Sequence, residues 1–368
     1  MLQPFLWQPN LGLRRRSRRP SLYLQPAMAL VIRWYDSACL AIVVGAIWAS
    51  LCMIRRSEGG GRRGVNDRSE YESLLIVVVA DGEAELPERR HVSYEQLWMS
   101  CWRVVHPAFL LVLRLVSMAT MAAVQSWDIA TYDSSILVYY TEWTFALVII
   151  YFAIGTVISA HGCWLYSKRY ITPDEEADRL FNADGHQNRP VTLPLRTNNN
   201  MSAVRLQSYH EQEADDEGAG FWVYCMQLVY QTSAGAVVLT DVIFWVLIVP
   251  FLSTAHFELN AIMGCMHTLN AVFLLVDTFL NNLKFPWFRM AYFVLWSCIY
   301  AIVQWILHAC GFTWWPYPFL ELDSPWAPLW YLCMALIHFP CYGLYWLIVR
   351  AKHSFFPKFF PNAYVRTD

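Results

Sequence analysis

Charged residues are scarce in this chain of 368 residues: aspartate, glutamate, lysine and arginine together make up 15% of it. An average soluble domain carries about 25%. Instead, 57% of the residues are hydrophobic and 16% are aromatic, and the mean hydropathy is +0.30. The formal net charge is only −2, so the totals indicate no nucleic-acid partner. This composition argues against an ordinary soluble domain and predicts a membrane protein in contact with lipids.

The sequence patterns of several common sites are missing as well. There is no CxxC, and most of the ten cysteines lie inside or beside apolar runs, which favours packed thiols over disulfides or a zinc site. A Gly-rich phosphate loop, a GxSxG elbow, an HExxH helix and an internal repeat are all absent. No metal or cofactor is therefore predicted.

Long hydrophobic runs are what the chain does contain. A membrane helix needs about 20 mostly apolar residues. Six runs meet that length, at 107–127, 136–165, 220–252, 260–280, 290–310 and 327–349, and a weaker seventh covers 37–54. Two of the six are too long for one upright span, so they must tilt or continue beyond the bilayer. The expected fold is an all-α polytopic membrane bundle with six core spans and one N-terminal candidate.

Loops without lysine or arginine alternate with basic loops through the six runs. The segments 128–135, 253–259 and 311–326 have none, whereas 166–219 has six, 281–289 has two and the tail from residue 350 has four. Because basic loops stay in the cytoplasm, we expect 166–219 and the C-terminus to be cytoplasmic. The endoplasmic reticulum and the plasma membrane are the favoured locations.

The expected organisation has five parts. Residues 1–36, with RRRSRR at 14–19, form a basic extension that is disordered or serves targeting; 37–54 is the weak hydrophobic segment; 55–106 is a cytoplasmic linker; 107–350 is the six-span core; 351–368 is a cytoplasmic tail. Since basic residues flank 37–54 on both sides, a span there places one basic flank on the wrong side. The alternatives are an interfacial segment and a segment that is removed.

Ionisable residues inside the runs are candidates for function, because each costs a few kcal/mol in hydrocarbon. They are Arg114, Asp241, His267, Asp277, His308 and His338. At the helical rise, His267 lies about 10 Å from the non-cytoplasmic end of its run, and Thr144 lies about 12 Å from the same surface. A hydroxyl and an imidazole are thus predicted at matching depth on different helices. Each also has a structural reading, in packing or in hydrogen bonds to helices.

The remaining polar residues also differ in their expected depth in the membrane. Asn270 is one turn beyond His267 on the same face. Asp277 lies near the cytoplasmic end, in the layer of Arg114, so we expect an Arg114–Asp277 ion pair that offsets the desolvation of both charges. Asp241 falls near the midplane and is either a helix–helix hydrogen bond or a functional group.

Four stretches carry a family resemblance: YYTEWTFALVIIYFAIG at 139–155, YQTSAGAVVLTDVIFW at 230–245, CMHTLNAVFLLVD at 265–277 and WPYPFLELD at 315–323. They resemble the androgen-induced-gene family of multi-pass membrane proteins. Their sequences look most similar to a plant branch related to the rolling stone proteins. The resemblance covers about 100–350 and not 1–95.

The resemblance implies an intramembrane threonine hydrolase acting on fatty-acid esters of hydroxy fatty acids or similar lipid esters. It assigns the nucleophile to Thr144 in EWTF and the second essential residue to His267 in GCMHT; some members carry a further histidine where this chain has Gly264. A threonine hydroxyl needs a base, which a neutral imidazole supplies.

Supporting candidates and rival functions stay open. The orienting or oxyanion-stabilising groups could come from Asn270, Asp241, Gln231 or Tyr140. The alternative function is a non-enzymatic receptor, scaffold or transporter, in which Asp241, Asp277 and Arg114 line a pathway or lock the bundle. A third hypothesis is haem ligation by His267 and His308.

Overall fold

The computed structural model of the chain describes residues 33–75, 94–183, 200–252 and 261–365. In these ranges the chain is helical, with one isolated β-bridge between Trp102 and Tyr364 and no strand. Seven of the described helices are long and apolar enough to cross a membrane. Apolar runs fold this way because hydrocarbon offers backbone amides and carbonyls no other partners. The protein is an all-α, multi-pass integral membrane protein.

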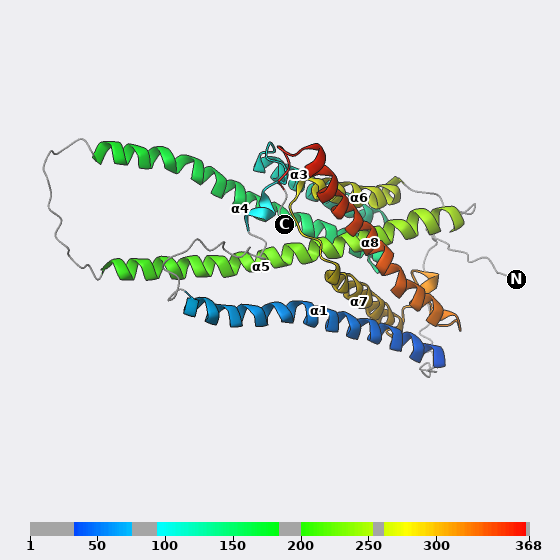
Figure 1. Ribbon diagram of the computed structural model, residues 1–368. Helices are drawn as coiled ribbons and strands as arrows, with labels where there is room; N and C mark the ends of the chain where they lie inside the picture. The colour runs from blue at the N-terminus through cyan, green and yellow to red at the C-terminus, as the bar shows by residue number, and fades with distance from the viewer. Residues whose placement is uncertain (1–32, 76–93, 184–199, 253–260, 366–368) are drawn as a thin grey trace.

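Eight α-helices and four shorter helical segments make up the described chain. The α-helices are α1 (Trp34–Leu75), α2 (Glu95–Trp98), α3 (Pro107–Tyr132), α4 (Tyr140–Ala183), α5 (Asn200–Val242), α6 (Ala261–Leu280), α7 (Met290–Ala309) and α8 (Ala327–Phe359). The others are η1 (Ser134–Val138), η2 (Ile243–Leu252), η3 (Trp287–Arg289) and η4 (Pro318–Leu320). Figure 1 shows that α4 and α5 both project well beyond the other helices, with their projecting ends apart; within the bundle the two helices pack together.

The six strong hydrophobic runs each fall on one long helix, and the weak run at 37–54 lies within α1. Segments expected as loops carry helix as well. α1 continues to Leu75 in the expected linker, α4 and α5 extend into 166–219, and α8 reaches Phe359 in the expected tail. The expectations for 1–32, 76–93 and 184–199 lie outside the described residues.

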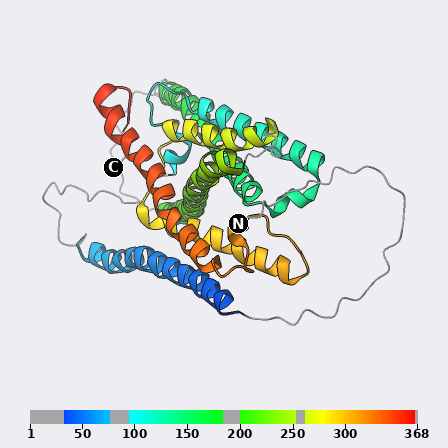
Figure 2. The same cartoon turned by 90° about the vertical axis from the view of Figure 1, so that its right-hand side faces the viewer.

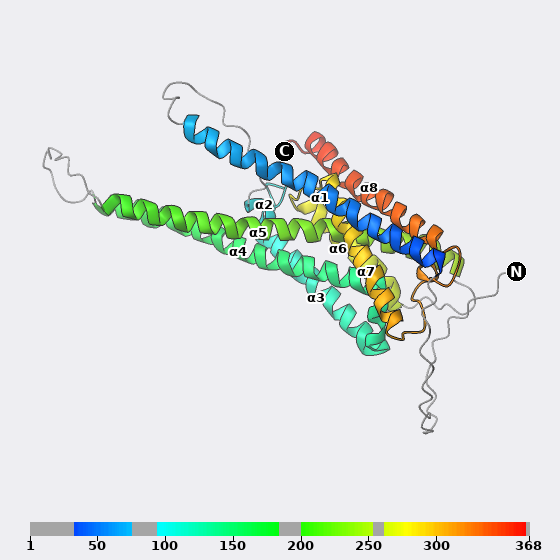
Figure 3. The ribbon, with the colours of Figure 1, turned by 90° about the horizontal axis from the view of Figure 1, so that it is seen from below.

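The bundle is organised around α5, which packs against α4, α6, α7 and α8. Figure 2 shows α3, α4 and α6 gathered on one side of it and α1, α7 and α8 on the other. In Figure 3, α1 lies along α8 and α7 at the edge of the bundle. The N-terminal helix is therefore packed against the core.

Glycine allows two close helix contacts. A Cβ on Gly235 of α5 would lie 2.6 Å from Cδ1 of Phe293 on α7, and a Cβ on Gly162 of α4 would lie 2.1 Å from Cγ of Trp98 on α2. Small residues at such crossings let helix backbones approach closely in a membrane. The first of these contacts draws α7 toward α5, where the two helices share a cavity wall.

Candidate functional site

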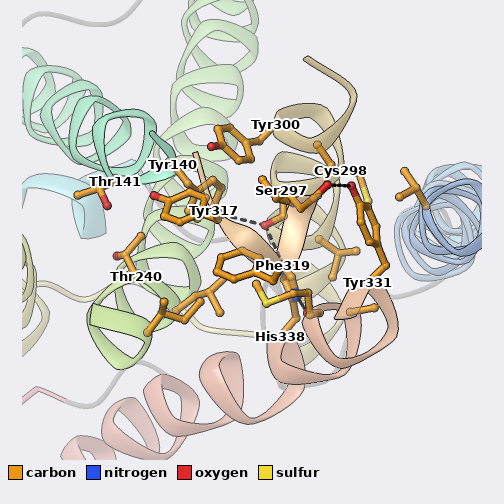
Figure 4. Close-up of a pocket in the computed structure, with 18 of the residues that line it drawn as sticks. Tyr140, Thr141, Thr240, Ser297, Cys298, Tyr300, Tyr317, Phe319, Tyr331 and His338 are labelled. Atoms are coloured by element: carbon orange, nitrogen blue, oxygen red, sulfur yellow. Dashed lines mark hydrogen bonds between the residues drawn. The ribbon is translucent and has the colours of Figure 1, made fainter. Parts of the chain in front are cut away.

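A cavity of about 110 Å³ lies at the end of the bundle where α4 and α8 begin, and α1, α5, α6, α7 and η4 contribute to its wall. Figure 4 shows side chains from several of these elements converging on it. Most of the wall is apolar, including Ile42, Val43 and Ala46 of α1. Nine residues with a hydroxyl or imidazole also line it: Tyr140, Thr141, Thr240, His267, Ser297, Tyr300, Tyr317, Tyr331 and His338. A mostly apolar cavity with a few converging polar groups is the usual form of a small-molecule site.

The imidazole of His267 is held on two sides. Its Nδ1 lies 3.2 Å from Oδ1 of Asp241, and the ring of Phe244 stacks on it with centroids 3.8 Å apart and an interplanar angle of 7°. Because a carboxylate only accepts hydrogen bonds, Nδ1 carries the hydrogen and Nε2 keeps a lone pair. No described residue is hydrogen-bonded to Nε2. The Asp241–His267 pair therefore presents an available base at the cavity wall.

Local winding and spacing explain how these groups meet. Helix α5 passes into the π-helical segment η2 at Ile243, two residues after Asp241. Such changes of winding often occur at functional sites. On α6, Asn270 is three residues after His267 and shares its face, and its Nδ2 donates to the same Asp241 oxygen at 3.4 Å. The carboxylate thus accepts from both the imidazole and the amide.

Thr144 lies beside the cavity and not in its wall. It is fully buried on α4, one turn after Tyr140 and three residues after Thr141, both of which line the cavity. Its Oγ1 has no hydrogen-bond partner in the described part of the chain, and it is not hydrogen-bonded to His267. The buried hydroxyls of Thr232 and Ser233 on α5 likewise have no partner in that part of the chain, and the Tyr140 hydroxyl lies close enough to Thr144 to interact with it.

Two of the proposed supporting residues have other partners. The hydroxyl of Tyr140 is in the cavity wall but lies 2.8 Å from Oγ of Ser297. Gln231 is ten residues before Asp241, about 15 Å along the helix; its Nε2 donates to the carbonyl of Lys284 at 2.6 Å, and its Oε1 accepts from Arg289 at 3.2 Å. Gln231 therefore supports the turn before α7, not His267.

A hydroxyl–imidazole contact that was not anticipated from the sequence occurs elsewhere in the same cavity wall. Oγ of Ser297 on α7 lies 2.8 Å from Nε2 of His338 on α8. Ser297 is thirteen residues from the 310 end of its predicted run and His338 is eleven from the 327 end of its own. The depth comparison applied to Thr144 and His267 would have matched these two residues as well, within about one turn.

Arg114 and Asp277 form an ion pair at the other end of α6. Both are fully buried, and Nε of Arg114 donates to Oδ1 of Asp277 at 2.9 Å. Arg114 also donates to Oγ of Ser159 at 2.7 Å, while Asp277 accepts from the Tyr151 hydroxyl and from Nδ2 of Asn281 at 2.9 Å. The pair lies about 15 Å along α6 from His267, so it anchors α3, α4 and α6 away from the cavity.

His308, the proposed second haem ligand, stacks on Trp315 with ring centroids 4.2 Å apart and is not in the cavity wall. No group of three or more histidine, cysteine, aspartate or glutamate residues with metal-binding geometry occurs among the described side chains.

Comparison with known proteins adds no assignment: no family model, no curated protein and no solved structure matches the chain.

Proposed function

We propose that the protein is an intramembrane hydrolase of lipid esters, with Thr144 as nucleophile and His267 as base. The observation that carries the proposal is the Asp241–His267 pair at the wall of a largely apolar cavity. A base whose second nitrogen is held by a carboxylate is the arrangement that activates hydroxyl nucleophiles. The motifs around Thr144 and His267 supply the resemblance to threonine hydrolases.

The reaction uses groups with defined tasks. Oγ1 of Thr144 attacks the ester carbonyl carbon while Nε2 of His267 takes its proton. The imidazolium then protonates the leaving alcohol, and water hydrolyses the acyl-threonine with the same base. Asp241 holds the tautomer and stabilises the imidazolium. The hydroxyl of Thr144 is not bonded to a carbonyl of its own helix, so its rotation toward the cavity gives up only its interaction with the Tyr140 hydroxyl.

The cavity also suits the substrate class. Its apolar wall, formed largely by helices long enough to cross a membrane, favours acyl chains. With the C-terminus in the cytoplasm, as the basic loops predict, the site lies in the opposite half of the membrane. Water then comes from the nearby outer surface. Fatty-acid esters of hydroxy fatty acids are the class indicated by the resemblance.

The test is turnover of a panel of lipid esters by the full chain in membranes. We expect His267→Gln and Thr144→Ala each to lower turnover by about 10²–10⁴-fold, which is the usual contribution of general acid–base catalysis to the rate. The matched controls are His308→Gln, outside the cavity wall, and Thr156→Ala, whose Oγ1 donates to its own helix at Phe152 at 2.7 Å. Undiminished turnover in Thr144→Ala would rule out Thr144 as the nucleophile.

One observation favours a second candidate, a non-enzymatic lipid-binding or transporting protein: the hydroxyl of Thr144 is not hydrogen-bonded to His267. This candidate predicts that the wild-type chain retains a lipid but turns over none of the esters. Solute flux that depends on Asp241 and not on Thr144 would support the transporter form.

A further inference from the structure

Two hydrogen bonds in the cavity connect α4, α7 and α8, and a third within α8 continues them. The Tyr140 hydroxyl lies 2.8 Å from Oγ of Ser297, which lies 2.8 Å from Nε2 of His338. Nδ1 of His338 lies 2.6 Å from the carbonyl oxygen of Met334, one turn earlier on α8. Figure 4 shows Ser297 between Tyr140 and His338. A serine hydroxyl is thus in direct contact with an imidazole whose second nitrogen is fixed.

The direction of these bonds follows from what each atom can do. A carbonyl oxygen only accepts, so Nδ1 of His338 carries the hydrogen and Nε2 has the lone pair. Ser297 then donates its hydrogen to Nε2 and accepts one from Tyr140. The carbonyl of Phe293 competes for the serine hydrogen, but at the longer distance of 3.3 Å. The arrangement has the order hydroxyl, base and orienting group that activates a serine.

Burial and position separate this contact from ordinary helix packing. Ser297 is only partly buried, and it lines the cavity together with Tyr140 and His338. Ser126 donates to the carbonyl of Ala122 on its own helix at 2.7 Å, whereas the equivalent contact of Ser297 with Phe293, at 3.3 Å, is longer than its contact with His338, at 2.8 Å. Ser297 instead faces a space lined by apolar groups, where the acyl part of an ester fits.

We propose that Ser297 is an acyl-accepting nucleophile for lipid esters, with His338 as its base. This inference rests on the substrate class of the proposed function and on none of the residues assigned there. It adds a second covalent site to the cavity and gives Tyr140 a role as the hydrogen-bond donor beside the reacting oxygen.

The step balances with an ester and water alone. Oγ of Ser297 bonds to the carbonyl carbon, and its proton passes to Nε2 of His338. The carbon–oxygen bond to the alcohol breaks, and the alcohol leaves with that proton. Water then attacks the acyl-serine, again losing a proton to His338, and the fatty acid and free Ser297 are released. The Tyr140 hydroxyl is placed to donate to the oxyanion that forms next to Oγ.

The experiment is labelling of the full wild-type chain in lipid bilayers with an alkyl fluorophosphonate, followed by mass-spectrometric mapping of the adduct. Oγ displaces fluoride from phosphorus and leaves a stable phosphonyl-serine. We expect the adduct on Ser297, its loss in Ser297→Ala and its retention in the control Ser126→Ala. Mapping on the wild-type chain needs no variant to fold, so it decides the proposal even if Ser297→Ala is unstable.

The role of His338 has its own readout. We expect His338→Ala to slow labelling of Ser297 by about 10²–10⁴-fold, and added imidazole to restore part of the rate. A histidine that only joined helices would show no such rescue, so labelling that stays slow at every imidazole concentration contradicts the assignment of the base.

The outcomes separate this inference from the proposed function. An adduct on Ser297 that persists in Thr144→Ala supports the inference, whatever that variant does to ester turnover. An adduct found on Thr144 and not on Ser297 overturns it and leaves the Thr144 mechanism standing. Absence of any adduct overturns it as well.

Discussion

Replacing Asp277 with alanine tests the anchoring role of the ion pair with Arg114. The substitution leaves a guanidinium fully buried in the bundle without its counter-charge. Tyr151 and Asn281, which both donate to the same carboxylate, lose their acceptor at the same time. The substitution therefore leaves one buried charge without a counter-charge and two buried hydrogen-bond donors without an acceptor.

The expected loss in the free energy of unfolding follows from these contacts. Breaking a buried ion pair by removing one partner costs about 3–5 kcal/mol, and leaving a buried polar group unsatisfied adds about 1–3 kcal/mol. Because Ser159 and the carbonyl of Leu97 still accept from Arg114, we expect the low end of this sum, about 5 kcal/mol. That changes the unfolding equilibrium constant by roughly 10³-fold, at about 1.4 kcal/mol per factor of ten.

The assay is equilibrium unfolding of the purified chain in mixed detergent micelles, with Asp323→Ala as the matched control. Arg33 and Asp323 also form an ion pair, at 3.7 Å, but their side chains are 47% and 71% exposed. Exposed pairs contribute about 0–1 kcal/mol. Equal losses in Asp277→Ala and Asp323→Ala would refute the reasoning. Combining Arg114→Met with Asp277→Leu should recover part of the loss, because neither charge then remains buried.

Two further predictions concern packing and thiol reactivity. Gly162→Ala should destabilise the protein by about 1–3 kcal/mol in the same unfolding assay, since the new Cβ would lie 2.1 Å from Trp98, whereas Gly45→Ala, with nothing within 4 Å, should be neutral or slightly stabilising. Burial raises the pKa of the Cys101 thiol, so less of it is thiolate at a given pH, and its reactivity rises only at higher pH. At neutral pH, N-ethylmaleimide should modify exposed Cys310 before Cys101, which mass spectrometry can measure. If Cys310 still reacted first in the SDS-unfolded chain, burial would not be the reason for the slower reaction of Cys101.

The fold was predictable from the sequence because hydrocarbon leaves an apolar run of sufficient length little choice but a helix. Hydropathy places the apolar part of a helix and says little about where the helix itself ends. The run at 107–127 accordingly continues as α3 to Tyr132, and α4 and α5 continue through residues expected in a polar loop. For the weak run at 37–54, basic flanks obscured a helix that packs on α7 and α8 and lines the cavity through Val43.

Part of the site was predictable for a related reason. The rise of 1.5 Å per residue converts sequence position into depth, which placed Arg114 and Asp277 in one layer. The spacing of three residues placed Asn270 on the same helix face as His267. Depth is only one coordinate. It does not give the rotation of a helix or its neighbours, so it could not show that the side chain of Asp241 faces His267. It also could not reveal that Tyr140 turns toward Ser297.

The two hydroxyl–imidazole sets in the cavity differ in what they lack. His267 is oriented by a carboxylate, which stabilises the positive charge that a base acquires, but no described hydroxyl donates to its Nε2. His338 already accepts from Ser297, but its Nδ1 is held by a neutral carbonyl, which stabilises that charge less. A bonded hydroxyl favours the first attack on an ester, and a charge-stabilised base favours activation of water. Since the sets share no residue, variants of Asp241 and of His338 can separate the contributions of the two sites.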